Sequence, residues 1–225
     1  MKSDQGMSQE DEDVLFGGAS DIPSLARSAG GGQGDNTLQL NTLDYSSDPL
    51  INKLRTVRDN LTNCPQLWAE LAQLCPDRRA LYDAHLCDEK LDISFAQMND
   101  IVQKSATVFA DLGVKKGNNV AVLGENSARW LVADHGIQRA GGASAVRGAD
   151  APLDELRYIY EHSDSAAIVV LQGPKLLKKL AKDAAEKGLT PNAGPLGLYN
   201  NRHGPVRSVI LLNRERTSDE DISRF

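Results

Sequence analysis

The stretch that decides the fold is residues 119–148, NVAVLGENSARWLVADHGIQRAGGASAVRG. It begins with an apolar run at 120–123 that shows no polar alternation, which is typical of a parallel strand covered on both faces. It ends with a second short strand pattern at 143–146. Two strands of this kind at such a separation predict one parallel crossover and therefore an α/β fold.

The residues between these strands have the pattern of a capped helix. Asn126 or Ser127 is placed to accept a hydrogen bond from the free amides of the first turn, and apolar residues recur at helical spacing over 130–140. Gly141 and Gly142 supply the left-handed geometry that ends helices. We therefore interpret the Gly-Glu-Asn-Ser turn as a helix cap rather than a phosphate cradle.

The same alternation continues toward the C-terminus. We expect a helix from Pro152, a buried strand at 166–171, a helix from Pro174 to Lys187, a loop over 189–204 and a strand at 206–212. Four strands alternating with three helices predict a partial doubly wound, mostly parallel sheet flanked by helices.

The segment before the crossover predicts helices and a hairpin. A helix is expected from Pro65 to just before Pro76, then strands at 80–86 and 91–93 around a turn at 87–90. A capping box of Ser94 and Gln97 opens a long helix that ends at Gly113.

The chain divides by composition into three parts. Residues 1–60 are rich in Ser, Gly, Asp, Gln and Asn and are expected to be a disordered or weakly helical leader. A short apolar helix within 50–57 leaves membrane-surface contact or docking open. Residues 61–213 form the predicted domain, and 214–225 are a polar tail where we expect the chain to be cut from a longer parent.

Composition excludes several classes of function. The 225 residues carry a formal net charge of -6, which argues against nucleic acid as a partner. No apolar run reaches the roughly 20 residues that span a bilayer, and the acidic N-terminus does not resemble a signal peptide. Cys64, Cys75 and Cys87 lack metal-site spacing, so we expect reduced, buried thiols and no metal site.

Several segments together resemble AMP-forming acyl-activating enzymes, the adenylate-forming superfamily. The segment 111–121, DLGVKKGNNVA, resembles the family's LGVKPGDRVAI, and 153–170 is similar to its PEELRYILEDSGAKVLI. The shorter matches are ISFAQM at 93–98 to L-T/S-Y-x-E-L, GENSARW at 124–130 to S-E-N-x-x-E-W, and RAGG at 139–142 to K-A-G-A. Val146-Arg147-Gly148, where most members carry a proline, resembles the plastid long-chain acyl-ACP synthetase branch of the long-chain fatty acyl-CoA synthetase group.

This resemblance implies a two-step reaction. A fatty-acid carboxylate attacks the α-phosphate of ATP, with Mg²⁺, to form an acyl-adenylate, and the thiol of CoA or of an acyl carrier protein then takes the acyl group. The Ser/Thr/Gly-rich loop ending in Pro-Lys-Gly that the family uses for phosphate does not occur in this chain. Gly173-Pro174-Lys175 resembles only the last residues of that loop, and we interpret it as the start of a helix. No catalytic residue is assigned, and the isolated chain is expected to be inactive.

Arg147 and Gly148 are the only candidate substrate-binding residues. They follow a predicted parallel strand, and open α/β sheets bind ligands beyond the carboxyl ends of their strands. The alternative is structural: Arg147 pairs with Asp150 or Glu155, and Gly148 only turns the chain.

Other polar residues favour ordinary explanations. His85, His135, His162 and His203 are expected at the surface or at helix ends. The basic helix face formed by Lys175, Lys178, Lys179 and Lys182 is expected to be solvated and balanced by Asp183 and Glu186, although an acidic carrier protein or lipid could contact it.

The leading hypothesis is therefore the N-terminal portion of an ATP-dependent, AMP-forming long-chain fatty-acid ligase, cytoplasmic or plastid and membrane-peripheral at most. The alternative is a truncated, non-catalytic binding or scaffold module that keeps the sheet. A dinucleotide-binding domain is disfavoured because the 124–127 turn lacks the second and third glycines of that fingerprint.

Overall fold

The computed structural model describes residues 49–83 and 91–212. The chain divides into two units, Met1–Asp44 and Tyr45–Phe225, and every described element belongs to the second. Most of the expected leader and the whole of the expected tail therefore lie outside the described residues. The leader's last part is the helix α2 (Pro49–Asn60), which confirms the predicted helix but buries none of its side chains.

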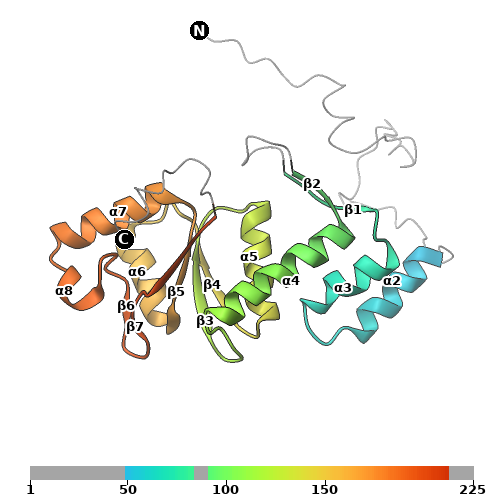
Figure 1. The fold of residues 1–225 in the computed structure, drawn as a ribbon, viewed down its shortest axis with the longest axis horizontal. Helices are drawn as coiled ribbons and strands as arrows, with labels where there is room; N and C mark the ends of the chain where they lie inside the picture. The colour runs from blue at the N-terminus through green and yellow to red at the C-terminus, as the bar shows by residue number, and fades with distance from the viewer. Residues whose placement is uncertain (1–48, 84–90, 213–225) are drawn as a thin grey trace, which may run out of the picture. The chain divides into compact units, whose positions relative to one another are not determined.

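A four-stranded parallel sheet forms the centre of this unit (Figure 1). Its strands are β3 (Asn119–Leu123), β4 (Ala143–Arg147), β5 (Ser165–Leu171) and β8 (Ser208–Leu211). Their order is β4-β3-β5-β8, and every neighbouring pair is parallel. All four strands therefore end at one common edge, which we call the carboxyl edge, and begin at the opposite amino edge.

Helices cover both faces of the sheet, as the apolar strand patterns predict (Figure 1). The covering helices are α4 (Phe95–Asp111), α5 (Ala128–Arg139), α6 (Leu153–His162) and α7 (Pro174–Glu186). Alternate residues of β3 separate the two cores. Val120 and Val122 pack with Phe109 and Ile137 on one side, and Leu123 packs with the buried side chains of α6 and α7 on the other. The partial doubly wound sheet is thereby confirmed.

The elements before the sheet also form as predicted. They are α3 (Gln66–Leu74) and the antiparallel strands β1 (Arg79–Asp83) and β2 (Leu91–Ser94). The capping box of α4 is present, since Ser94 Oγ accepts from the amide of Gln97 at 3.3 Å and Gln97 Oε1 accepts from the amide of Ser94 at 2.8 Å. The expected turn at 87–90, with the 84–86 end of the first strand, lies outside the described residues.

The expected loop over 189–204 contains more structure than predicted. It holds the short helix α8 (Thr190–Ala193) and a small hairpin of β6 (Tyr199–Asn200) and β7 (Gly204–Pro205). Asn200 is buried, and its side-chain amide donates to the carbonyl of Ser165 at 2.7 Å while its Oδ1 accepts from the amides of Arg202 and His203. Elements this short have no sequence periodicity from which they could be predicted. The hairpin is held instead by the hydrogen bond from Asn200 to Ser165, 35 residues away in sequence.

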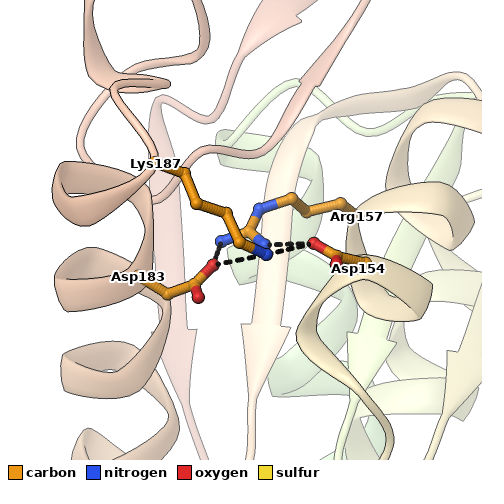
Figure 2. Close-up of polar contacts among 4 residues, drawn as sticks. All are labelled: Asp154, Arg157, Asp183 and Lys187. Carbon is orange, nitrogen blue, oxygen red and sulfur yellow. Dashed lines mark hydrogen bonds and ion pairs between the residues drawn. The ribbon is translucent and has the colours of Figure 1, made fainter.

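Four charged side chains join α6 to α7 (Figure 2). Arg157 lies 2.9 Å from Asp154 and 2.7 Å from Asp183, and Lys187 lies 2.8 Å and 3.4 Å from the same two carboxylates. The hydrogen bond from Lys187 holds the pKa of Asp154 below its ordinary value. The prediction that Asp183 balances the lysine face of α7 is therefore wrong, because it turns toward α6; Glu186 does pair with Lys182 at 3.7 Å.

Candidate functional site

The carboxyl edge of the sheet contains one topological switch point. From β3 the chain crosses to β4 on one side, and from β5 it crosses to β8 on the other. The loops after β3 and β5 therefore diverge from two adjacent strands, and such a crevice is where open α/β sheets bind ligands. Arg147 ends β4, the edge strand beside β3, so it borders the switch point without lying in it.

The crevice is bridged by a side chain from the chain itself. Gln172 follows β5, and its Oε1 accepts from the amide of Glu125 at 2.7 Å across the switch point. A Cβ added to Gly124 would lie 2.8 Å from that same Oε1 and 3.3 Å from Leu212 Cδ1. Gln172 was missed from the sequence because its partner is 47 residues away and no local motif marks it.

The N-terminus of α5 beside the crevice is also occupied. Ser127 Oγ accepts from the amide of Trp130 at 3.1 Å, and Asp83 Oδ2 accepts from the amide of Ala128 at 3.0 Å. These are two of the amides that a helix N-terminus would otherwise offer to an anion. The interpretation of the 124–127 turn as a helix cap is confirmed, with Ser127 rather than Asn126 as the capping residue.

Arg147 is held by a carboxylate in the first turn of α6. Its Nε lies 2.7 Å from Glu155 Oε1, and both side chains remain partly open to solvent, at 44% and 41% exposure. The hydrogen bond to Glu155, helped by the charge of that carboxylate, raises the pKa of Arg147 above its ordinary value. This ion pair is the structural partner that the sequence offered as the alternative to substrate binding.

Gly148 lies against two carboxylates rather than an open cleft. A Cβ at this position would be 2.8 Å from Asp150 Oδ1 and 3.4 Å from Glu125 Oε1. Glu125 Oε1 in turn accepts from the amide of Ala149 at 2.8 Å. The absence of a side chain at 148 lets the loops after β3 and β4 close on each other, and whether substrate also contacts this turn stays a prediction.

The described histidines match the expectation only in part. His162 ends α6 as predicted and stacks on Tyr158. His135 lies in the middle of α5 against Trp68, so the prediction of a surface or helix-end position is wrong for it, and burial lowers its pKa. His203 lies in the β6–β7 turn, and His85 lies outside the described residues.

The two thiols among the described residues are free but not buried. Cys64 is exposed and Cys75 is half-buried, so the expectation of buried thiols is wrong for both, because they flank α3 rather than face its core side. Cys87 lies outside the described residues. Pro174 begins α7, which confirms that Gly173-Pro174-Lys175 is a helix start.

Two carboxylates at the carboxyl edge are hydrogen-bonded by the chain itself. Of the carboxylates there, Glu125 is engaged by the amide of Ala149 and Glu155 by Arg147. Within residues 49–83 and 91–212 no three His, Cys, Asp or Glu side chains gather as metal ligands.

Comparison with known proteins supplies the family. The family model described as AMP-binding enzyme matches residues 68–204. The chain is similar to the chloroplastic long-chain-fatty-acid–[acyl-carrier-protein] ligase AEE15 of Arabidopsis thaliana, at 36% identity over 123 residues, which are 55% of this chain and 17% of that protein. It is also similar to the probable acyl-activating enzyme 16, chloroplastic, of the same organism, at 32% identity with the same coverage of both chains.

The fold is similar to solved structures of low sequence identity. The N-terminal domain of FACL13 from Mycobacterium tuberculosis aligns with a TM-score of 0.52 and 20% identity over 73% of this chain and 36% of that one. The long-chain-fatty-acid-CoA ligase FadD1 from Archaeoglobus fulgidus aligns with a TM-score of 0.52 and 16% identity over 71% of this chain and 28% of that one. None of the described helices has the length and apolar character needed to cross a membrane.

The chain thus spans 17% of the length of the two Arabidopsis relatives, and its sheet is the one found in the N-terminal domain of FACL13. The segments at 93–98, 111–130 and 139–170 that carry the sequence resemblance all fall within the matched residues 68–204. This chain belongs to the AMP-binding enzyme family, the adenylate-forming superfamily.

Proposed function

We propose that this chain is the N-terminal portion of an ATP-dependent, AMP-forming long-chain fatty-acid ligase. In the complete ligase a fatty-acid carboxylate oxygen attacks the α-phosphorus of ATP, and pyrophosphate leaves. The thiol sulfur of CoA or of an acyl carrier protein then attacks the acyl carbonyl, and AMP leaves. The family match over 68–204 carries this proposal, and the printed name of AEE15 supports the fatty-acid substrate.

This portion would form part of the folded synthetase domain but would not contribute catalytic residues. We assign residues 61–213 to the synthetase domain and 1–60 to a leader, and we assign ATP and Mg²⁺ binding to the rest of the longer ligase. The polar contacts at the carboxyl edge support that division, because the side chains of Gln172 and Glu155 are already hydrogen-bonded to Glu125 and Arg147.

ATP–pyrophosphate exchange tests the proposal. The purified 225-residue chain should give no fatty-acid-dependent exchange, whereas the product of the reading frame continued past Phe225 should give it. Exchange by the short chain would show that the portion is active alone. Absence of exchange from the continued product with any fatty acid, or a genuine stop codon after Phe225, would favour the non-catalytic binding or scaffold module.

The same relatives support a proposal for the acceptor and the compartment. AEE15 is named as an acyl-carrier-protein ligase and as chloroplastic, which supports a carrier-protein thiol and a plastid location for the complete enzyme. Comparing acyl transfer to CoA and to acyl carrier protein under equal thiol concentrations tests the first point. Preference for CoA would contradict the carrier-protein acceptor. We propose peripheral membrane contact in either case.

We further propose that Arg147 and Gly148 form part of the wall against which the acyl chain binds. Arg147→Ala in the complete ligase should raise KM for the fatty acid about tenfold or change its chain-length preference, since about 1.4 kcal/mol of binding energy is a factor of ten. Glu155→Ala is the matched control, because it breaks the same 2.7 Å ion pair but leaves the guanidinium in place. If both variants keep wild-type kinetics, the pair is structural and the binding role is wrong.

A further inference from the structure

The amino edge of the sheet holds a depression of about 440 Å³. It lies where α4 ends, beside the start of β5 and of β8, and is lined among others by Lys115, Asn118, Ala167, His203, Arg207 and Ser208. It is thus at the opposite end of the strands from Arg147 and the switch point. The proposed ligase chemistry makes no use of it.

The charge of this depression is of one sign. Lys115 comes from the loop before β3 and Arg207 from the residue before β8, 92 positions apart in sequence, and none of the lining residues is acidic. Within residues 49–83 and 91–212 neither cation has a carboxylate partner; Arg207 donates only a long hydrogen bond, 3.5 Å, to the carbonyl of His203. In a chain of net charge -6, two unpaired cations around one depression form a local site for an anion.

Two features of the wall are unusual for a merely structural hollow. Ala167 has a φ of 61°, in the left-handed region that an alanine rarely adopts, where the register between β3 and β5 shifts. His203 Nε2 is buried and has no hydrogen-bond partner among the residues that the structure describes. Strained backbone and unsatisfied buried polar atoms gather at binding sites because a ligand repays their cost.

One feature opposes anion binding but is weaker than the cations. Leu112 and Gly113 directly follow α4, and a helix C-terminus carries roughly half a negative charge. The carbonyls of the last turn already accept hydrogen bonds from the amides of Gly113 and Val114. Lys115 and Arg207 each carry a full positive charge and none of the lining residues is acidic, so the charges of the lining favour an anion.

We propose that the depression between Lys115 and Arg207 binds a small phosphate-bearing anion. Both side chains are preferred partners of phosphate oxygens, the arginine through a planar fork and the lysine as a point charge. Asn118 and Ser208 add neutral polar groups to the same wall. Since this site uses no residue of the proposed ligase chemistry, its failure and the failure of the ligase proposal are separate results.

A titration of the ¹⁵N-labelled 225-residue chain with inorganic phosphate, at constant ionic strength set with sodium chloride, tests the site. Amide signals of Gly113, Ala167 and Ser208 should shift and saturate. Lys115→Ala and Arg207→Ala should each weaken the affinity about tenfold, the usual size of one lost charge-assisted hydrogen bond. Unchanged spectra outside the depression would show that both variants stay folded.

Lys116→Ala and Arg202→Ala are the matched controls, because each removes one exposed cation close in sequence without touching the depression. They should leave the affinity within twofold. Shifts that do not saturate, or four variants that weaken binding equally, would reduce the effect to general screening and overturn the proposal.

The phosphate group could belong to a free small molecule or to a lipid headgroup. Sedimentation with phosphatidic acid vesicles, and with phosphatidylcholine vesicles as the uncharged reference, separates these sources. Co-sedimentation that Lys115→Ala and Arg207→Ala abolish would assign the phosphate to a headgroup. No sedimentation together with saturable phosphate shifts would assign it to a free anion.

Discussion

The carboxyl edge and the amino edge of the same sheet differ in whether their charged and polar side chains are paired. At the carboxyl edge Arg147 pairs with Glu155 at 2.7 Å, and Gln172 satisfies the amide of Glu125 at 2.7 Å. At the amino edge Lys115 and Arg207 line a depression without an acidic residue in its wall. The polar groups described at the edge where this fold class usually binds ligands are paired with one another, whereas the two cations of the amino edge have no carboxylate partner among the described residues.

The difference shows that the position of a charged residue on a fold does not by itself make a site. A ligand at Arg147 must compete with a carboxylate that is already hydrogen-bonded, so part of its binding energy is lost in breaking that pair. A ligand at Lys115 and Arg207 displaces no carboxylate of the described residues and competes only with the long hydrogen bond, 3.5 Å, from Arg207 to the carbonyl of His203. An unpaired cation is therefore a stronger indication of an anion site than a cation at the expected end of a strand.

The largest expected effect comes from a change between α4 and α5, two of the helices that cover the sheet whose edges are compared. Gly136 lies where α5 packs against α4. A Cβ at this position would lie 2.7 Å from Ser105 Cβ and 3.2 Å from the Ser105 backbone carbon. Gly136→Ala should lower the free energy of unfolding by about 2 kcal/mol, since overpacking costs up to about 3 and the gain in helix propensity returns about 1. Urea denaturation measures the loss.

The double variant Ser105→Ala/Gly136→Ala provides the control. Removing the hydroxyl gives part of the space back, so the two changes should be non-additive, with the pair more stable than the sum predicts. Additive losses would mean that the two helices do not meet at Gly136.

A smaller effect is expected from opening the carboxyl edge alone. Gly124→Ala places a Cβ against Gln172 Oε1 and should displace that side chain from the amide of Glu125. The expected loss is about 1.5 kcal/mol, from one hydrogen bond and a small overlap with Leu212. Because Gln172→Ala removes the same hydrogen bond, adding it to Gly124→Ala should cost little more; a full additional loss would show that the bridge across the switch point does not exist.

The regular elements of the fold could be predicted from the sequence because their signals are local. Each of these signals acts within a few residues: the capping box at Ser94, the apolar run at 120–123 and the proline before α6. Each predicted element is present at the residues where the sequence shows its pattern. The family was also readable, since the segments at 111–130 and 139–170 lie within the residues that the AMP-binding model matches.

The polar contacts between elements could not be predicted, because sequence patterns do not specify which side chains meet across the fold. Gln172 bridges 47 residues to Glu125, and Asp183 turns to Arg157 on α6 although the helix pattern places it beside the lysines of α7. The depression at the amino edge depends on Lys115 and Arg207, which no motif connects.

The buried hydroxyl of Tyr160 near the amino edge gives a third prediction. Tyr160 is fully buried, its Oη has no partner among the described residues, and burial raises its pKa to about 12 despite the opposing charge of Arg207. Tyr160→Phe should stabilise the protein by about 1 kcal/mol, because an unsatisfied buried group is removed.

The pH dependence of unfolding provides its control. A phenol whose pKa is raised on folding contributes stability that is complete below pH 10 and is lost as the pH rises from 10 toward 12. The wild-type chain should show this alkaline decline and Tyr160→Phe should lack the tyrosine's share of it. A variant less stable than wild type at pH 7 would mean that the hydroxyl has a partner, such as a bound water.

The smallest effect is expected at Ala167, where the two explanations of the amino edge separate. Its left-handed backbone costs an alanine about 1 to 2 kcal/mol, and glycine avoids this cost but loses about 0.5 to 1 through a more flexible unfolded chain. Ala167→Gly should therefore stabilise the chain by about 0.5 kcal/mol, while Ala166→Gly, the neighbour without a positive φ, should destabilise it by a similar amount.

The phosphate affinity of Ala167→Gly separates the two explanations of this strained backbone. If the strain serves only the bulge in β5, the phosphate affinity will not change in Ala167→Gly. If the strained alanine holds the wall of the depression in place for the anion, the more stable variant will bind phosphate more weakly, because the ligand must then order a segment that the alanine kept ordered.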